Sequence, residues 1–197
     1  MMGNLSKLTS GFSFGDINFG GFSTSASWVG YFEKNKEFSY ALVDEAVDLF
    51  ESFFRSKSER GVVVTALSFD DEREEDDEVI RRYQHLYEEM KEKRLLLPMS
   101  ESFECYLYGE TCLPVSSLSL SFERSDFTAI SKLLMCHTGV VGQVGFYIDP
   151  LLSVAIYPHD DIGFGCIALN SDDGICREFL NHCSRSGSFN VVVGDEI

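Results

Sequence analysis

The sequence lacks a long apolar run and an N-terminal export signal. No uninterrupted hydrophobic stretch approaches the roughly 18 residues from which a membrane-spanning helix is inferred. The segment from Met1 to Lys7 contains neither the apolar region nor the cleavage site of a signal peptide. We therefore expect no membrane association and a cytoplasmic location, in which the six cysteines remain free thiols.

The short motifs of common catalytic and metal centres are also missing. There is no Cys-x-x-Cys, His-x-x-x-His or Gly-x-Ser-x-Gly, and no lysine completes a phosphate-binding loop after the early glycines. On the helix expected there, Cys176 and Cys183 would lie two turns apart, about 10 Å, which is too far for one zinc ion. The sequence therefore predicts no cofactor, no bound metal and no enzymatic activity.

Basic residues are scarce relative to acidic ones. The 197 residues include 16 Lys and Arg against 32 Asp and Glu, which gives a net charge of −16. A field of this sign repels nucleic acid phosphates and anionic membranes and attracts basic proteins over long range. We therefore expect a basic protein partner and no direct nucleic acid binding. Solubility or adaptation to high salt is the alternative explanation of the acidity.

The chain has ample material for a folded core. Aromatic residues make up 13% of the sequence, with 17 Phe and 8 Tyr, which excludes disorder of the whole chain. The length fits a single domain over residues 1–197. We expect an irregular Gly- and Phe-rich β segment at 1–30, a helix–strand–helix region at 31–97, and a β-rich half with two helices at 98–197.

Hydrophobic patterning predicts an α+β fold, with an antiparallel or mixed sheet and helices packed mainly on one face. Helices are predicted at 37–55 with Ser39 as the cap, at 79–94, at 127–136 with Ser125-Asp126 as the cap, and after Asp172-Asp173. A continuous apolar run at 62–67 predicts a buried central strand. Further strands are predicted at 103–108, at 117–122 with Leu118, Leu120 and Phe122 on one side, and at 189–193. Three β-rich runs between 143 and 169 predict a meander.

An acid block from Asp70 to Glu78 is the first candidate for a binding site. It contains eight acids and one arginine immediately before a predicted helix. Acids in a first helical turn suit the helix dipole, so a solvated helix start is one interpretation. Seven net negative charges in nine residues exceed what a cap needs, which favours docking of a basic partner. The residues predicted to contact this partner are Asp70, Asp71, Glu72, Glu74, Glu75, Asp76, Asp77 and Glu78, followed by Asp160, Asp161, Asp172 and Asp173.

The second candidate is His159-Asp160-Asp161, between two predicted strands. A histidine and two carboxylates would suit metal binding or acid–base catalysis. Neighbouring residues of an extended chain point to opposite sides, so we expect Asp160 and Asp161 not to share one ion. Asp-Asp-x-Gly is also ordinary turn chemistry. A structural turn, a partner contact and a catalytic site therefore stay open as interpretations.

The second half of the chain resembles a bacterial domain family of unknown function. The hallmark of that family is an apolar strand, a Tyr-Asp-Asp-Arg-Gly turn and a following Ile-Ala. The matching segments here are Phe146 to Pro150, Ala155 to Tyr157, Asp160 to Gly163 and Ile167-Ala168. The earlier run from Tyr31-Phe32-Glu33 through the first helix, Ala41 to Phe54, is also similar. This chain inserts Pro158-His159 after the tyrosine and has Ile162 in place of the arginine. The resemblance implies no activity.

By type, small acidic proteins of this kind resemble bacterial immunity proteins that neutralise toxins. The resemblance implies a stoichiometric inhibitor of a basic toxin domain, which we expect to be a nuclease. Two alternatives remain: a hydrolase or metal-dependent enzyme that uses His159, Asp160 and Asp161, and an acidic mimic of nucleic acid.

Overall fold

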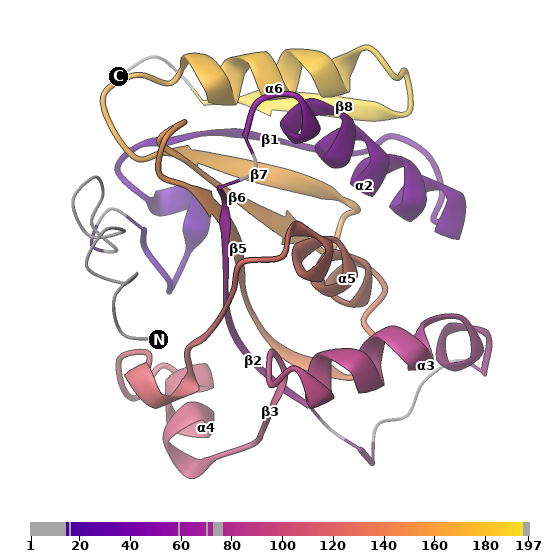
Figure 1. Ribbon diagram of the computed structural model, residues 1–197, viewed down its shortest axis with the longest axis vertical. Helices are drawn as coiled ribbons and strands as arrows, with labels where there is room; N and C mark the ends of the chain where they lie inside the picture. Colours follow the sequence, from indigo (N-terminus) through magenta and orange to yellow (C-terminus); the bar gives the residue numbers. More distant parts are fainter. Residues whose placement is uncertain (1–14, 16, 59, 70, 73–76, 195–197) are drawn as a thin grey trace.

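The computed structural model describes residues 15, 17–58, 60–69, 71–72 and 77–194, and its centre is an eight-stranded sheet (Figure 1). The strand order is β3-β2-β5-β6-β7-β1-β8, and β4 pairs with β2 on the edge that β3 also uses. The pair β2–β3 is parallel and the other pairs are antiparallel, so the sheet is mixed. The strands are β1 (Trp28–Lys34), β2 (Val62–Phe69), β3 (Leu97–Pro98), β4 (Ser119–Ser121), β5 (Val140–Asp149), β6 (Val154–His159), β7 (Gly163–Ala168) and β8 (Phe189–Val193).

Four of the five α-helices in the described residues bury their apolar sides against one face of this sheet. They are α2 (Tyr40–Arg55), α3 (Asp77–Glu92), α5 (Arg124–Met135) and α6 (Gly174–Ser184). The fifth, α4 (Glu101–Leu107), packs on the opposite face. The predicted cap of α2 is confirmed, because the Ser39 hydroxyl accepts a hydrogen bond from the Leu42 amide. The α+β class and the predicted layering are therefore confirmed.

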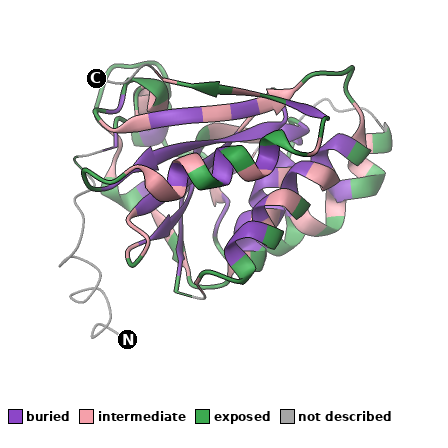
Figure 2. Cartoon of the chain, turned by 90° about the horizontal axis from the view of Figure 1, so that it is seen from above, coloured by how far each residue is buried: buried purple, intermediate pink, exposed green. Residues whose placement is uncertain are grey.

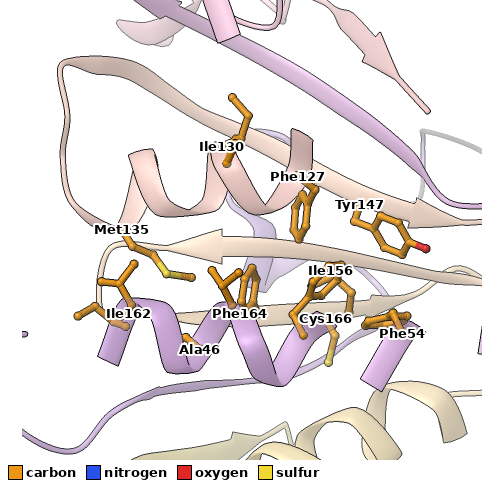
Figure 3. Packing of buried hydrophobic residues seen from close by; sticks show 14 of the residues in the cluster. Ala46, Phe54, Phe127, Ile130, Met135, Tyr147, Ile156, Ile162, Phe164 and Cys166 are labelled. Carbon is orange, nitrogen blue, oxygen red and sulfur yellow. The ribbon is translucent and has the colours of Figure 1, made fainter. Parts of the chain in front are cut away.

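The core under the four helices is built largely from aromatic rings. The Phe50 ring of α2 lies 4.8 Å from Phe127 of α5, 5.2 Å from Tyr147 of β5 and 5.4 Å from Phe164 of β7, measured between ring centroids. Figure 3 shows side chains of α2 and α5 meeting those of the central strands. The solvent-facing sides of the helices are exposed, as Figure 2 shows, so the helices are amphipathic as their periodicity predicts.

Alternate residues of the same strands build a second cluster on the opposite face. Phe22, in a short 3₁₀ turn (Phe22–Thr24), covers it with its ring centroid 4.8 Å from those of both Phe146 and Tyr157. The helix α4 contributes Phe103. Strand β2 is buried along both faces and has neighbours on both edges, which confirms the central strand predicted from its continuous apolar run.

The strand predicted at 103–108 is wrong, because residues 103–107 belong to α4 and Tyr108 caps its end. The Ser100 hydroxyl accepts a hydrogen bond from the Phe103 amide, and Glu101 and Glu104 lie in the first turn. A capping serine followed by acids stabilises a helix start. Gly109, at φ 75°, follows the end of the helix. This local capping outweighs the β preference of the aromatic residues.

The strand predicted at 117–122 is shorter than expected. Val115–Ser117 forms a 3₁₀ turn, and only Ser119–Ser121 pairs with β2.

The predicted cap Ser125-Asp126 is also wrong, because α5 begins at Arg124 after Glu123. Asp126 is buried instead, where its carboxylate accepts hydrogen bonds from Lys93 and Ser121. A buried carboxylate requires such partners, and this requirement decides its position.

Within the segment predicted as irregular β structure at 1–30, the described residues form a strand only from Trp28 onward. Residues 18–27 form turns and the 3₁₀ turn at Phe22–Thr24, and β1 begins only at Trp28. Residues 1–14 lie outside the described part of the chain.

No helix among the described residues combines the length and the apolar character needed to cross a bilayer.

Candidate functional site

The turn between β6 and β7 brings His159, Asp160 and Asp161 together. A ring nitrogen of His159 and a carboxylate oxygen of each aspartate lie within 4.8 Å of one another. The expectation that the two aspartates cannot share an ion is therefore wrong. It assumed an extended chain, whereas the chain reverses here and places the buried Ile162 at φ 54°. One cation would be within reach of all three groups.

His159 is held in place by a strand that is distant in the sequence. Its Nε2 donates a hydrogen bond to the carbonyl oxygen of Phe32 in β1, at 2.8 Å. Burial lowers the pKa of His159 from its ordinary value, against an opposing contribution from that hydrogen bond. The ring is therefore neutral near pH 7, with Nδ1 carrying the lone pair. This is the state required of a metal ligand or a general base.

Asp161 already has a cationic partner. The Lys34 ammonium lies 3.2 Å from its Oδ1, and the Lys34 amide donates to its backbone carbonyl at 3.0 Å. These contacts tie the turn to the end of β1. Asp160 is exposed and forms no salt bridge with the described residues. A metal ion would therefore compete with Lys34 for the carboxylate of Asp161.

A cavity of about 330 Å³ lies beside this turn, where β5 and β6 separate. The ladder between the two strands extends only from Asp149 to Tyr147 on β5, so the rest of β5 diverges from β6. Pro158, which has no amide hydrogen to donate, lies in the separated part of β6. The polar groups around the cavity are His137, Gln143, His159 and Asp160.

Sequence reasoning missed His137 and Gln143. His137 follows the end of α5 and Gln143 lies near the start of β5. Neither residue has a neighbouring motif, and only the divergence of the two strands brings them to the same cavity as His159. No local signal in the sequence reports such a divergence.

The described part of the acid block lies at the end of β2 and at the start of α3. Asp71, Glu72 and Glu78 are exposed, and the Asp71 carboxylate pairs with the Lys91 ammonium at 2.7 Å. Asp70, Glu74, Glu75 and Asp76 lie outside the described residues, as does the side chain of Asp77. Asp71 and Glu72 follow the exit of the chain from β2.

Asp172 and Asp173 do not join the other predicted contacts. They precede α6, where the Asp172 carboxylate accepts a hydrogen bond from the Gly174 amide and the Asp173 carboxylate binds Arg177 at 2.7 Å. Strands β6 and β7 are antiparallel, so the chain leaves β7 at the end of the sheet opposite the turn at Asp160. Both aspartates serve the start of α6, which is a structural role.

Three of the four buried cysteines, Cys136, Cys166 and Cys183, are poorly suited to nucleophilic chemistry. Burial raises the pKa of Cys136 to about 11, and it also raises the pKa values of Cys166 and Cys183. A thiol is a weak nucleophile until it is ionised. These three side chains pack in the core under the helices.

Comparison of the chain with known protein families, with curated proteins and with solved structures finds no match.

Proposed function

We propose that this protein is an immunity protein that binds a basic toxin domain, for which a nuclease is the best candidate, and inhibits it stoichiometrically. The observation that carries the proposal is the uneven distribution of charge. Residues 70–110 contain 14 of the 32 acidic residues and 6 of the 16 basic ones, a net charge of −8 and half of the total of −16.

The fold supports this proposal by bringing two parts of that segment to one end of the sheet. β2 and β3 are parallel, with Phe69 opposite Pro98, so the chain leaves both strands at the same end. Asp71 and Glu72 follow the first exit, and Glu101 follows the second within three residues. Such a concentration of one charge attracts a partner of opposite charge and raises association rates to as much as about 10⁸–10⁹ M⁻¹s⁻¹ at low salt.

The test is a measurement of binding to any basic protein that is encoded by a gene beside this one. We expect a 1:1 complex whose association rate falls steeply between about 50 mM and about 300 mM salt. The triple variant Asp71→Asn, Glu72→Gln, Glu78→Gln should associate several-fold more slowly and show a weaker salt dependence. The matched control Glu37→Gln, Glu45→Gln, Asp48→Asn removes the same charge from the region of α2.

The control should retain most of the wild-type rate, because it changes the total charge but not the acidic end. Equal slowing in both variants would assign the effect to total charge rather than to a docking surface. Failure of the wild-type protein to bind the basic neighbour would contradict the proposed function.

The convergence of His159, Asp160 and Asp161 beside a cavity favours a metal-dependent hydrolase as a second candidate. Calorimetric titration with Zn²⁺ and Mn²⁺ tests it. Binding should be lost in Asp160→Asn and strengthened in Lys34→Met, which removes the competing ammonium. Absence of binding by the wild-type protein and by Lys34→Met at millimolar metal would eliminate this candidate.

A further inference from the structure

The chain between β3 and α5 exposes an unusual amount of apolar surface. Six of the ten exposed large apolar side chains in the described residues lie between positions 99 and 122. Tyr108 is 75% exposed, Val115 is 81% exposed and Phe122 is 58% exposed. Single exposed apolar residues are ordinary, whereas contiguous exposed apolar patches mark interaction surfaces, so the position of these six residues on the fold decides what they do. The six residues are Met99, Leu107, Tyr108, Val115, Leu120 and Phe122.

The register of β4 shows which face of the sheet this segment occupies. Leu120 lies opposite Val64 on β2, and Val64 belongs to the cluster on the face away from the four helices. Cross-strand partners point to the same face, so Leu120 lies on that face too. Leu118, two residues earlier, packs against the same cluster.

Helix α4 packs on this same face of the sheet and adds acidic groups to it. Its Phe103 is buried against the strands, whereas Glu101, Glu104 and Tyr108 are exposed. Glu101 and Glu104 are three positions apart on the helix, and Tyr108, which caps its end, follows four positions later, so the three residues lie along one side. Figure 1 shows α4 separated from the other helices by the sheet. We name the six apolar residues together with Glu101, Glu104 and Glu110 the α4–β4 surface.

This surface is free of basic residues. No Lys or Arg occurs between residues 95 and 123, whereas four glutamates do. Of the cations that flank the segment, Lys93 binds Asp126 at 2.6 Å and Glu89 at 2.8 Å, Arg124 donates to the Ser58 carbonyl at 2.9 Å, and Arg94 is exposed. A second copy of the chain would bring glutamates against glutamates, so charge complementarity selects a basic partner.

We infer that the α4–β4 surface is the contact site for the basic toxin domain, an inference that rests on the proposed function. Tyr108, Val115 and Phe122 are the apolar anchors, and Glu101, Glu104 and Glu110 pair with Lys and Arg of the partner. Aromatic anchors surrounded by polar groups carry most of the binding energy in protein interfaces. The acid block at the end of β2 then attracts the partner, and the α4–β4 surface holds it.

The test compares alanine variants in their binding to the basic partner sought among the products of the adjacent genes. Tyr108→Ala and Phe122→Ala should each raise the dissociation constant at least about tenfold, mainly through faster dissociation. Phe38→Ala and Leu151→Ala are matched controls, since these side chains are 49% and 66% exposed at other places, and each should stay within about threefold of wild type. Thermal unfolding of all four variants checks that the fold is retained.

The double variant Glu101→Gln, Glu104→Gln gives a second readout that does not depend on the apolar side chains. It should slow association and reduce its salt dependence. If the wild type binds but these variants behave like the controls, the inference is wrong and the proposed function stands. If the wild type binds no basic partner, both the inference and the proposed function are wrong. Self-association of the wild type that Phe122→Ala abolishes would assign the surface to a second copy and would also overturn the inference.

Discussion

At the scale of single residues, Gly163 controls how closely β7 approaches β1. A Cβ atom at this position would overlap the carbonyl oxygen and carbon of Phe32, which are backbone atoms that cannot swing aside. The same carbonyl accepts the hydrogen bond from His159. Gly163 therefore permits the contact that fixes the candidate histidine.

Substitution Gly163→Ala should reduce the free energy of unfolding by about 3 kcal/mol, because relief of the overlap requires displacement of a buried strand. Urea unfolding monitored by circular dichroism measures this change. The control Gly20→Ala, which introduces a Cβ whose nearest neighbour is an Asn18 side-chain atom at 3.4 Å, should change stability by less than about 0.5 kcal/mol. Similar losses in both variants would refute the close approach of the strands.

Substitution His159→Gln should make the stability of the protein less dependent on pH. Burial in the folded state lowers the pKa of His159 from its ordinary value of 6.5. At a pH below about 6.5, this residue therefore binds more protons in the unfolded state than in the folded state. The free energy of unfolding therefore decreases as the pH falls from the ordinary pKa of histidine toward the lowered pKa of His159 in the folded state. The urea midpoint of the wild type should drop further between about pH 7.5 and about pH 5.5 than that of the variant. Identical pH profiles would show that His159 is not desolvated.

At the scale of elements, α4 shows why a pattern of side chains can mislead. Residues 103–108 contain Phe and Tyr, which favour strands, whereas the decisive signal lies before them at Ser100. That signal was present in the sequence, and weighing caps against β preference would have found the helix. The same principle explains the success of the α2 prediction, where Ser39 and the apolar periodicity agree.

Substitution Ser100→Ala should destabilise the protein by about 1 kcal/mol, because the Phe103 amide loses its hydrogen-bond partner. Chemical unfolding gives the value, and Thr111→Ala, an exposed substitution outside the helices, is the comparison. Hydrogen exchange of the first α4 amides should rise in Ser100→Ala only. Unchanged exchange would contradict the assigned cap.

The strands and their order illustrate what local sequence cannot provide. The meander, the buried β2 and the last helix and strand were predicted correctly, because each has a periodicity of its own. The pairing of β1 between β7 and β8 depends on contacts across more than 100 positions and has no local signature. The separation of β5 from β6, and with it the cavity at His159, arises from the same long-range packing. The acid block was visible as composition, but the exposed α4–β4 surface required the fold.

At the scale of the whole molecule, the net charge of −16 acts on both stability and association. Like charges repel within the compact state, so screening them favours folding. The urea midpoint should therefore rise when NaCl is increased from about 20 mM to about 200 mM. A midpoint that falls over this range would mean that attractive ion pairs outweigh the repulsion.

We propose that the surplus acidic charge at one end of the fold serves the inhibition of a basic toxin domain. The most direct test titrates this protein into the basic neighbour while the toxic activity, assayed first as nuclease activity, is followed. Activity should fall linearly to zero at one molar equivalent at low salt, and more protein should be needed as salt is raised. Activity that persists at a large molar excess of this protein would contradict the account.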